Sequence, residues 1–122
     1  RPLHTIIPGM VLDHNGLSSL SYGVMGGQYQ PVGQAHVLNN ILDFEMSPQE
    51  AITFPRAFHF SNIYKLEKEV SKEIKDGLSK IGHNVVHIDE THGGGQAIQI
   101  DRLKGKLIGG SDPRKDGYAK GY

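Results

Sequence analysis

The 122-residue chain contains no cysteine, which excludes disulfide bonds and thiol catalysis and leaves the redox compartment open. It carries no excess charge either, because thirteen basic residues balance thirteen acidic ones. That balance removes the electrostatic footprint of a protein that binds nucleic acid or an acidic membrane surface. Apolar runs are short, and none approaches the roughly 20 residues of a membrane-spanning helix. The composition predicts a soluble single domain spanning residues 1–122.

Glycine, by contrast, is abundant, and its 16 residues favour a fold with many tight turns over a helical bundle. The most informative pair is Gly26-Gly27, between a strand pattern that ends at Met25 and a helical pattern that begins near Pro31. Glycines at such a junction let the backbone approach a ligand, and the free N–H groups of a helix start favour negative charge. If that charge forms only in a transition state, the pair is an oxyanion hole. The alternative is that the glycines merely permit a tight turn.

The first 25 residues have the pattern of a β-hairpin. Residues 5–12 and 17–25 read as two strands joined by Asp13-His14-Asn15-Gly16, in which Asn15-Gly16 supplies the positive φ angles of the turn. Three further short strands are expected over residues 84–89, 96–101 and 106–109, with residues 102–105 as a turn.

Two helices are expected between these groups of strands. The first begins near Pro31 and shows a three-to-four-residue period over Val37, Leu38, Ile41, Leu42 and Glu45. The second opens at Ser47-Pro48-Gln49-Glu50, which combines an N-cap, a proline at the first helical position and a glutamate at the third, and it must end before Pro55. Both helices should cover one face of a sheet.

Several motifs recur in a familiar order: Arg1-Pro2-Leu3-His4-Thr5-Ile6-Ile7-Pro8, the Gly26-Gly27 pair, residues 51–56, and Gly110-Ser111-Asp112-Pro113-Arg114. With these motifs the chain resembles, over nearly all its length, the C-terminal part of the γ-glutamyltransferase small subunit, in a divergent branch. The resemblance implies an α+β fold that forms part of a four-layer αββα sandwich of the N-terminal-nucleophile hydrolase type, with about six strands and three helices. Members of the family cut themselves, and the new N-terminal Thr attacks a γ-glutamyl amide.

The resemblance also assigns roles to four residues. Gly26 and Gly27 match the glycine pair whose backbone N–H groups hold the oxyanion. His4 and Thr5 match a Ser-Ser pair that binds the substrate's α-carboxylate, but His4 replaces a small donor with a bulky, titratable ring. The oxyanion machinery is therefore expected to be retained and the pocket around the glutamyl group to be rebuilt. No cofactor is implied.

The nucleophile of the family would lie upstream of Arg1. We therefore expect the chain to be a fragment that is inactive alone, derived from an enzyme acting on a small γ-glutamyl or other amide substrate. Two alternatives stay open: a related amidase or acylase with a non-glutamyl substrate, and a noncatalytic binding module. A fragment would leave an apolar sheet face uncovered, so a homo-oligomer, and a dimer in particular, is expected.

The segment from Ile63 to Ile81 gives two conflicting indications. Its apolar residues are spaced by three or four throughout, which alone predicts one helix of about five turns. The family resemblance instead implies a strand over residues 64–67 and a helix that begins at Ser71 and ends at Gly82. We favour the second interpretation.

Seven histidines raise the question of a metal site, and five possible ligands lie within ten residues: His83, His87, Asp89, Glu90 and His92. No spacing such as His-Glu-x-x-His is present, and strand alternation would place His83, His87 and Asp89 along one solvated strand edge. We therefore predict no metal site.

Three other features each have a functional and a purely structural interpretation. His92-Gly93-Gly94-Gly95 lacks the ending of a P-loop and is typical of a flexible turn between strands. Arg56 and Arg114 could each form a buried ion pair that fixes a loop near the active site, or could lie on the surface.

Overall fold

The computed structural model describes residues 5–121, which form two compact units. One unit comprises the residues up to Thr53 together with those from Gly93 onward, and the other is Phe54–His92. The single domain expected over residues 1–122 stays a prediction. In the described part of the chain, no helix has the length and apolar character needed to span a membrane.

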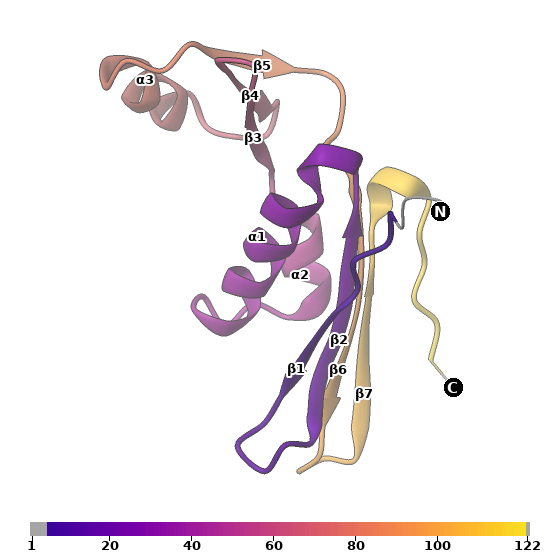
Figure 1. Ribbon diagram of the computed structural model, residues 1–122. Coiled ribbons are helices and arrows are strands. Elements are labelled where there is room, and N and C mark those ends of the chain that lie inside the picture. The colour runs from indigo at the N-terminus through magenta and orange to yellow at the C-terminus, as the bar shows by residue number, and fades with distance from the viewer. Residues whose placement is uncertain (1–4, 122) are drawn as a thin grey trace. The chain divides into compact units, whose positions relative to one another are not determined.

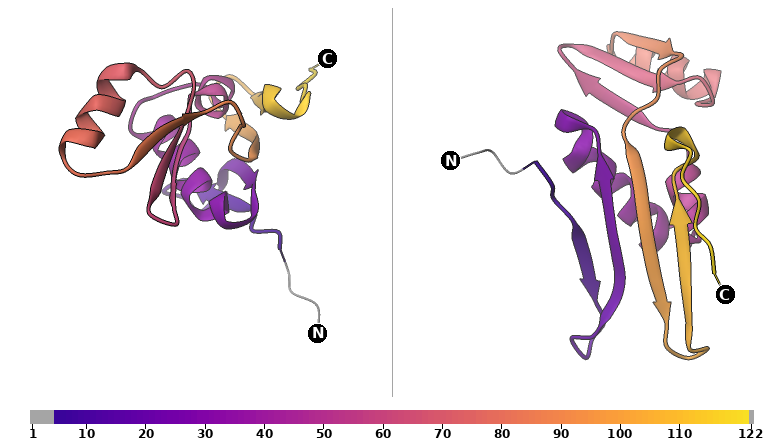
Figure 2. Two further views of the ribbon diagram at one scale, coloured as in Figure 1. Left: turned by 90° about the horizontal axis from the view of Figure 1, so that it is seen from above. Right: turned by 90° about the vertical axis from the view of Figure 1, so that its right-hand side faces the viewer.

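The first unit is built on a four-stranded antiparallel sheet (Figure 1), whose order is β1 (Gly9–Leu12), β2 (Ser18–Met25), β6 (Gly94–Asp101) and β7 (Lys106–Ser111). Alternate residues point to opposite faces of such a sheet. Leu20, Val24 and Ala97 are buried on the face that the helices cover, whereas Ile98 on the other face is 50% exposed. Figure 2 (right) looks onto the other face of the sheet, with the two helices that follow β2 in the chain lying behind it.

The predicted hairpin is confirmed, with corrections at two positions. The carboxylate of Asp13 accepts the N–H groups of Asn15 (2.9 Å) and Leu17 (3.0 Å), and only Gly16 (φ 77°) has a positive φ angle, not Asn15. Because Asp13 caps the loop, one glycine suffices to close it. The first strand begins at Gly9 and not at residue 5, since Pro8 has no N–H for the ladder.

Two helices pack on the covered face, as expected. The 3₁₀ turn η1 (Gly27–Tyr29) leads directly into α1 (Gln30–Leu42), and α2 is Pro48–Thr53. The capping box forms: the N–H of Ser47 donates to Glu50 (2.9 Å) and the N–H of Glu50 donates to the Ser47 hydroxyl (3.3 Å). The α1 helix ends before Glu45, which has φ 54°. A second 3₁₀ turn, η2 (Pro113–Lys115), follows β7.

The second unit is a three-stranded sheet with one helix. Its order is β3 (Ala57–Phe60), β4 (Ile63–Glu67) and β5 (Val85–Ile88), and α3 (Lys72–Lys80) connects the parallel pair β4 and β5. Ser71 caps α3 through the N–H of Ile74 (3.4 Å), and Gly82 (φ 100°) follows its end. The strand-then-helix interpretation is confirmed, and the single long helix is wrong. Strand β3 was not predicted.

Candidate active site

The Gly26-Gly27 pair forms the junction between β2 and the helical segment. Gly26 (φ 137°) caps η1 with its carbonyl, which accepts the N–H of Tyr29 at 3.0 Å, and Gly27 has φ 58°. Both angles lie where residues with a side chain are strained. Among the described residues, no hydrogen bond uses the N–H of Gly26 or Gly27. Two backbone donors are thus left for a ligand at the start of a helical segment.

The junction is supported from behind by Gly93. A Cβ atom on Gly93 (φ 60°) would overlap the carbonyl oxygen of Met25 and lie 2.9 Å from the ring of Tyr29. A Cβ atom on Gly26 would in turn lie only 3.0 Å from the Cα of Gly93. The Tyr29 ring, 3% exposed, fills the space beside both glycines.

This contact corrects one sequence expectation. The run from Gly93 to Gly95 is not simply a flexible turn, because β6 already begins at Gly94. The glycines allow close approach, since a Cβ atom on Gly94 would lie 2.7 Å from the side chain of Lys115.

A pocket of about 530 Å³ opens beside the junction, within the size range of small-molecule sites. Residues 5–8 and 23–27, together with Gln30, Gly94 and Gln96, form its wall. The structure therefore brings Thr5 together with Gly26 and Gly27, whereas His4 lies outside the described residues. No ionisable side chain is among the described residues of the wall.

Sequence reasoning missed the two glutamines of this wall. Gln30 is the first residue of α1, immediately before Pro31, and Gln96 lies in β6 opposite Gly23 of β2. A strand alignment placing residue 96 beside residue 23 would have identified Gln96, but the pairing is not contained in any local pattern.

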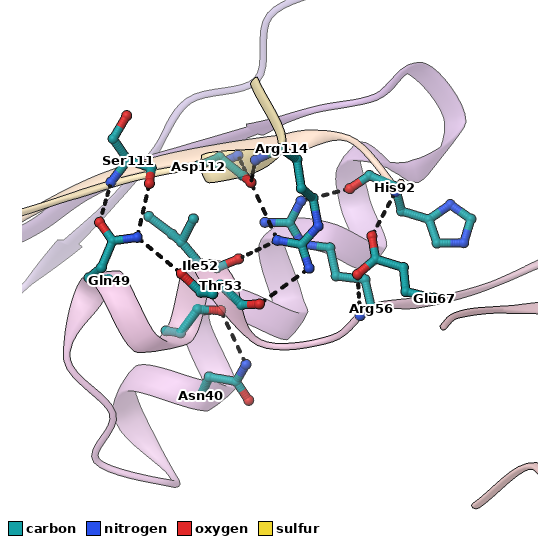
Figure 3. A network of polar contacts seen from close by, with 12 residues as sticks. Asn40, Gln49, Ile52, Thr53, Arg56, Glu67, His92, Ser111, Asp112 and Arg114 are labelled. Atoms are coloured by element: carbon teal, nitrogen blue, oxygen red, sulfur yellow. Dashed lines mark hydrogen bonds and ion pairs between the residues drawn. The ribbon is translucent and has the colours of Figure 1, made fainter. Parts of the chain in front are cut away.

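The Ser111-Asp112-Pro113-Arg114 motif forms a polar network in the first unit (Figure 3). The carboxylate of Asp112, 0% exposed, accepts the N–H of Gly95 (2.6 Å) and pairs with the Arg114 guanidinium (3.3 Å). Arg114 also donates to the carbonyls of Ile52 (3.0 Å) and Thr53 (3.3 Å). Of the two alternatives for Arg114, the structure shows the buried ion pair, and this pair ties the end of α2 to the start of β6.

Gln49 and Ser111 make a second set of contacts in the same unit (Figure 3). The amide of Gln49 accepts the N–H of Ser111 and donates to its carbonyl, both at 3.0 Å. The hydroxyl of Ser111 donates to the side-chain oxygen of Gln96 at 2.7 Å. The pocket wall is therefore connected, through Ser111, to α2.

In the second unit, Arg56 is fully buried, so the surface alternative is excluded. Its guanidinium donates to the carbonyl of His92 at 2.6 Å, and its N–H donates to the carboxylate of Glu67 at 2.9 Å. The other oxygen of that carboxylate accepts the N–H of His92, also at 2.9 Å. Burial lowers the pKa of the His92 ring, and the hydrogen bond to the Lys65 carbonyl and the nearby Glu67 only partly oppose the shift.

The remaining histidines do not converge on a metal-binding geometry in the described residues, where no group of three or more His, Asp or Glu side chains could hold an ion. β5 lies at the edge of its sheet, and His87 is exposed with its ring against the Val70 carbonyl (3.0 Å). The solvated edge inferred for this strand is therefore confirmed for His87.

The sequence of this chain is similar to those of known proteins. The model of the Gamma-glutamyltranspeptidase family matches residues 1–122. The chain is 34% identical over 131 aligned residues to the glutathione hydrolase-like YwrD proenzyme of Bacillus subtilis, an alignment that covers 99% of the chain and 24% of that protein. The chain thus spans about a quarter of the length of this curated relative.

Two solved structures are similar throughout the fold. Cephalosporin acylase from Bacillus halodurans has a TM-score of 0.87 at 36% identity, covering 98% of this chain and 23% of that one. A mutant of gamma-glutamyltranspeptidase from Helicobacter pylori has a TM-score of 0.83 at 31% identity, covering 93% of this chain and 63% of that one. With its α+β fold of the N-terminal-nucleophile hydrolase type, the chain belongs to the gamma-glutamyltranspeptidase family.

Proposed function

We propose that this chain forms the oxyanion-binding wall of an enzyme that transfers or hydrolyses an acyl group held in an amide bond. In the complete protein, the hydroxyl of an upstream Thr attacks the amide carbonyl while its own α-amine takes the proton. The N–H groups of Gly26 and Gly27 donate to the oxygen on which negative charge develops. Water or an amine then releases the acyl group, with a γ-glutamyl compound as donor. The chain alone, without the nucleophile, does not convert substrate.

One observation carries this proposal. The N–H groups of Gly26 and Gly27 have no acceptor among the described residues, and both glycines line the pocket that Thr5 also lines. Donors held by the backbone cost no reorganisation when the charge forms, which makes them effective in a transition state. The role of Thr5, and that of His4, is to bind the substrate's carboxylate.

The test is Gly27→Val in the full-length protein. The Cβ position at Gly27 is open, with no other atom within 4 Å, so valine causes no steric clash there. The change therefore acts mainly by straining the backbone, which has φ 58°, and by altering the direction of the N–H group. We expect kcat for γ-glutamyl-p-nitroanilide to fall about 10²- to 10³-fold, as for the loss of one oxyanion donor.

The matched control is Gly105→Val, at φ 61° and also with no atom within 4 Å, in the turn between β6 and β7. It imposes similar backbone strain away from the pocket and should leave kcat unchanged. If Gly27→Val turns over donor as fast as this control, Gly27 has no part in the chemistry.

A second function, an acylase with a non-glutamyl donor, is favoured by the absence of ionisable side chains from the described pocket wall. The similarity to a cephalosporin acylase supports the same alternative. The gene region preceding Arg1 discriminates between these functions. A Thr at a self-cleavage junction supports either enzyme, an Arg placed to bind a carboxylate favours glutamyl donors, and a missing Thr leaves only a noncatalytic binding module.

A further inference from the structure

Methionine supplies the most readily oxidised side chains of this chain, because the sequence has three methionines and neither cysteine nor tryptophan. Met25 differs from the other two in its position. It is the last residue of β2, it lines the pocket, and it directly precedes Gly26. Met10 lies in β1 and Met46 lies between α1 and α2, and neither belongs to the described pocket wall.

The side chain of Met25 is accessible. Strand alternation places Met25 on the face of the sheet opposite the helices, whereas its neighbour Val24 is buried on the covered face. The residue opposite Met25 on β6 is Gly94, which has no side chain to cover it. Met25 lies beside this glycine, since a Cβ atom on Gly94 would be 3.5 Å from the Cγ of Met25. With 55% of its surface exposed, Met25 is open to a small oxidant.

The sulfur of Met25 also keeps both lone pairs available. Among the described residues, no hydrogen bond uses it. Met10 is the natural comparison, because it is 61% exposed but its sulfur accepts the Ser18 hydroxyl at 3.3 Å. A lone pair that accepts a hydrogen bond is a weaker nucleophile toward peroxide. The two exposed sulfurs therefore differ in availability, and only that of Met25 lies in the pocket.

We propose that Met25 is a modification site, at which a hydroperoxide oxidises the thioether to a sulfoxide and thereby impairs catalysis in the pocket. The sulfur attacks the hydroxyl oxygen of the peroxide and forms an S–O bond while the O–O bond breaks. The proton on that oxygen passes to the departing oxygen, which leaves as water or an alcohol. Sulfur loses two electrons and the peroxide gains them. The effect on turnover rests on the proposed function, whereas the chemistry at sulfur does not.

The sulfoxide changes the character of the pocket wall. Four apolar residues share that wall with Met25: Ile6, Ile7, Pro8 and Val24. Oxidation places a polar oxygen among them. In a complex, this oxygen is set against substrate without a hydrogen-bond donor, which weakens binding. We therefore expect kcat/KM to fall about 5- to 100-fold. In the free protein the oxygen stays in water, so stability should not change.

The experiment treats the full-length protein with hydrogen peroxide and maps the oxidised methionines by peptide mass spectrometry. In parallel, kcat/KM is measured for γ-glutamyl-p-nitroanilide. We expect the sulfoxide to form at Met25 before it forms at Met10 or Met46, and activity to fall in proportion to the oxidised fraction of Met25. The two methionine sulfoxide reductases, one for each sulfoxide epimer, should together restore the activity.

Substitutions at Met25 separate oxidation at this site from damage elsewhere. Met25→Leu removes the sulfur, so the treated variant should keep the kcat/KM of its own untreated sample. Met25→Gln places a polar side chain of similar length in the wall, and it should show the loss without peroxide while keeping the wild-type free energy of unfolding in urea. The matched controls are at Met10. Met10→Leu should stay sensitive to peroxide, and Met10→Gln should convert the donor at the wild-type rate.

Three results overturn the inference: Met25 that stays reduced while Met10 is oxidised, a sulfoxide at Met25 without loss of kcat/KM, or a Met25→Leu variant as sensitive to peroxide as wild type. An untreated wild-type protein with no activity on this donor contradicts the proposed function instead. The peptide map then decides alone, since a sulfoxide at Met25 supports the modification site and a reduced Met25 overturns it.

Discussion

Replacing Gly93 with alanine should destabilise the protein at the junction that carries the Gly26-Gly27 pair. At φ 60° an L-residue loses about 1–2 kcal/mol relative to glycine. The added Cβ would also overlap the Met25 carbonyl oxygen and lie 2.9 Å from the Tyr29 ring, and such overpacking typically costs about 1–3 kcal/mol. The two effects together predict a loss of about 2–5 kcal/mol in the free energy of unfolding.

Gly105→Ala separates the two contributions. Gly105 has φ 61° but no atom within 4 Å of the Cβ position, so only the backbone cost of about 1–2 kcal/mol applies. Urea denaturation followed by circular dichroism compares the two variants in the full-length protein. The Gly93 variant should also lose kcat, because its contact displaces the peptide that precedes Gly26, whereas the Gly105 variant should keep it. Equal stability losses in the two variants would refute the argument that Gly93 supports the junction.

Three further changes test other contacts. Ser47→Ala removes the hydroxyl that accepts the N–H of Glu50 but keeps the backbone N–H that donates to the Glu50 carboxylate. It should lower stability by about 1 kcal/mol in urea denaturation, whereas Ser79→Ala, which removes no cap, should not. Asp112→Asn leaves the mostly buried Arg114 guanidinium without its counter-charge and should cost about 3–5 kcal/mol in the same assay; a loss below 1 kcal/mol would contradict a tightly buried pair. Because burial lowers the pKa of His92 in the folded state, the unfolded chain binds more protons, and stability should fall as the pH drops through about 6.5 toward that lowered pKa. His92→Gln should flatten this dependence between pH 7.5 and 5.5, and an unchanged slope would exclude His92 as its source.

Local sequence signals predicted the elements whose cause is local. The Ser47 box and the Asp13 to Gly16 turn are recognisable from a few residues each, because the side chains and backbone groups they join are close in sequence. Periodicity failed between Ile63 and Ile81, since the strand β4 contributes apolar residues that fall by chance on the helical spacing of α3. Ser71 was the better signal, because a cap marks a boundary that periodicity does not contain.

The missed elements depend on pairing between distant residues. Strand β3 is only four residues long and is joined to β4 by Ser61 and Asn62, both with positive φ angles, so neither a glycine nor a proline marks the turn. In the candidate site, Gly26 and Gly27 were visible as a glycine pair at a strand end. Gln96 was not, because its place in the pocket wall follows from the register of β6 against β2.

The uncovered face of the four-stranded sheet leads to a prediction about assembly. Met10, Ile98 and Leu107 lie on it with exposed fractions of 61, 50 and 71%, and within the described residues no further strand pairs with the outer edge of β1 or of β7. Such a face tends to associate, so the 122-residue chain by itself should form a dimer that buries more than about 1,000 Å².

Ile98→Lys places a charge at the centre of that face and should yield monomers in light scattering. Leu103→Lys is the control, because Leu103 is fully exposed in the β6–β7 turn and its replacement should leave the dimer intact. A dimer is expected because the face is both apolar and uncovered. A wild-type chain that scatters as a 13.4 kDa monomer and melts cooperatively would show that the face is tolerated in water, and the expected homo-oligomer would have no basis.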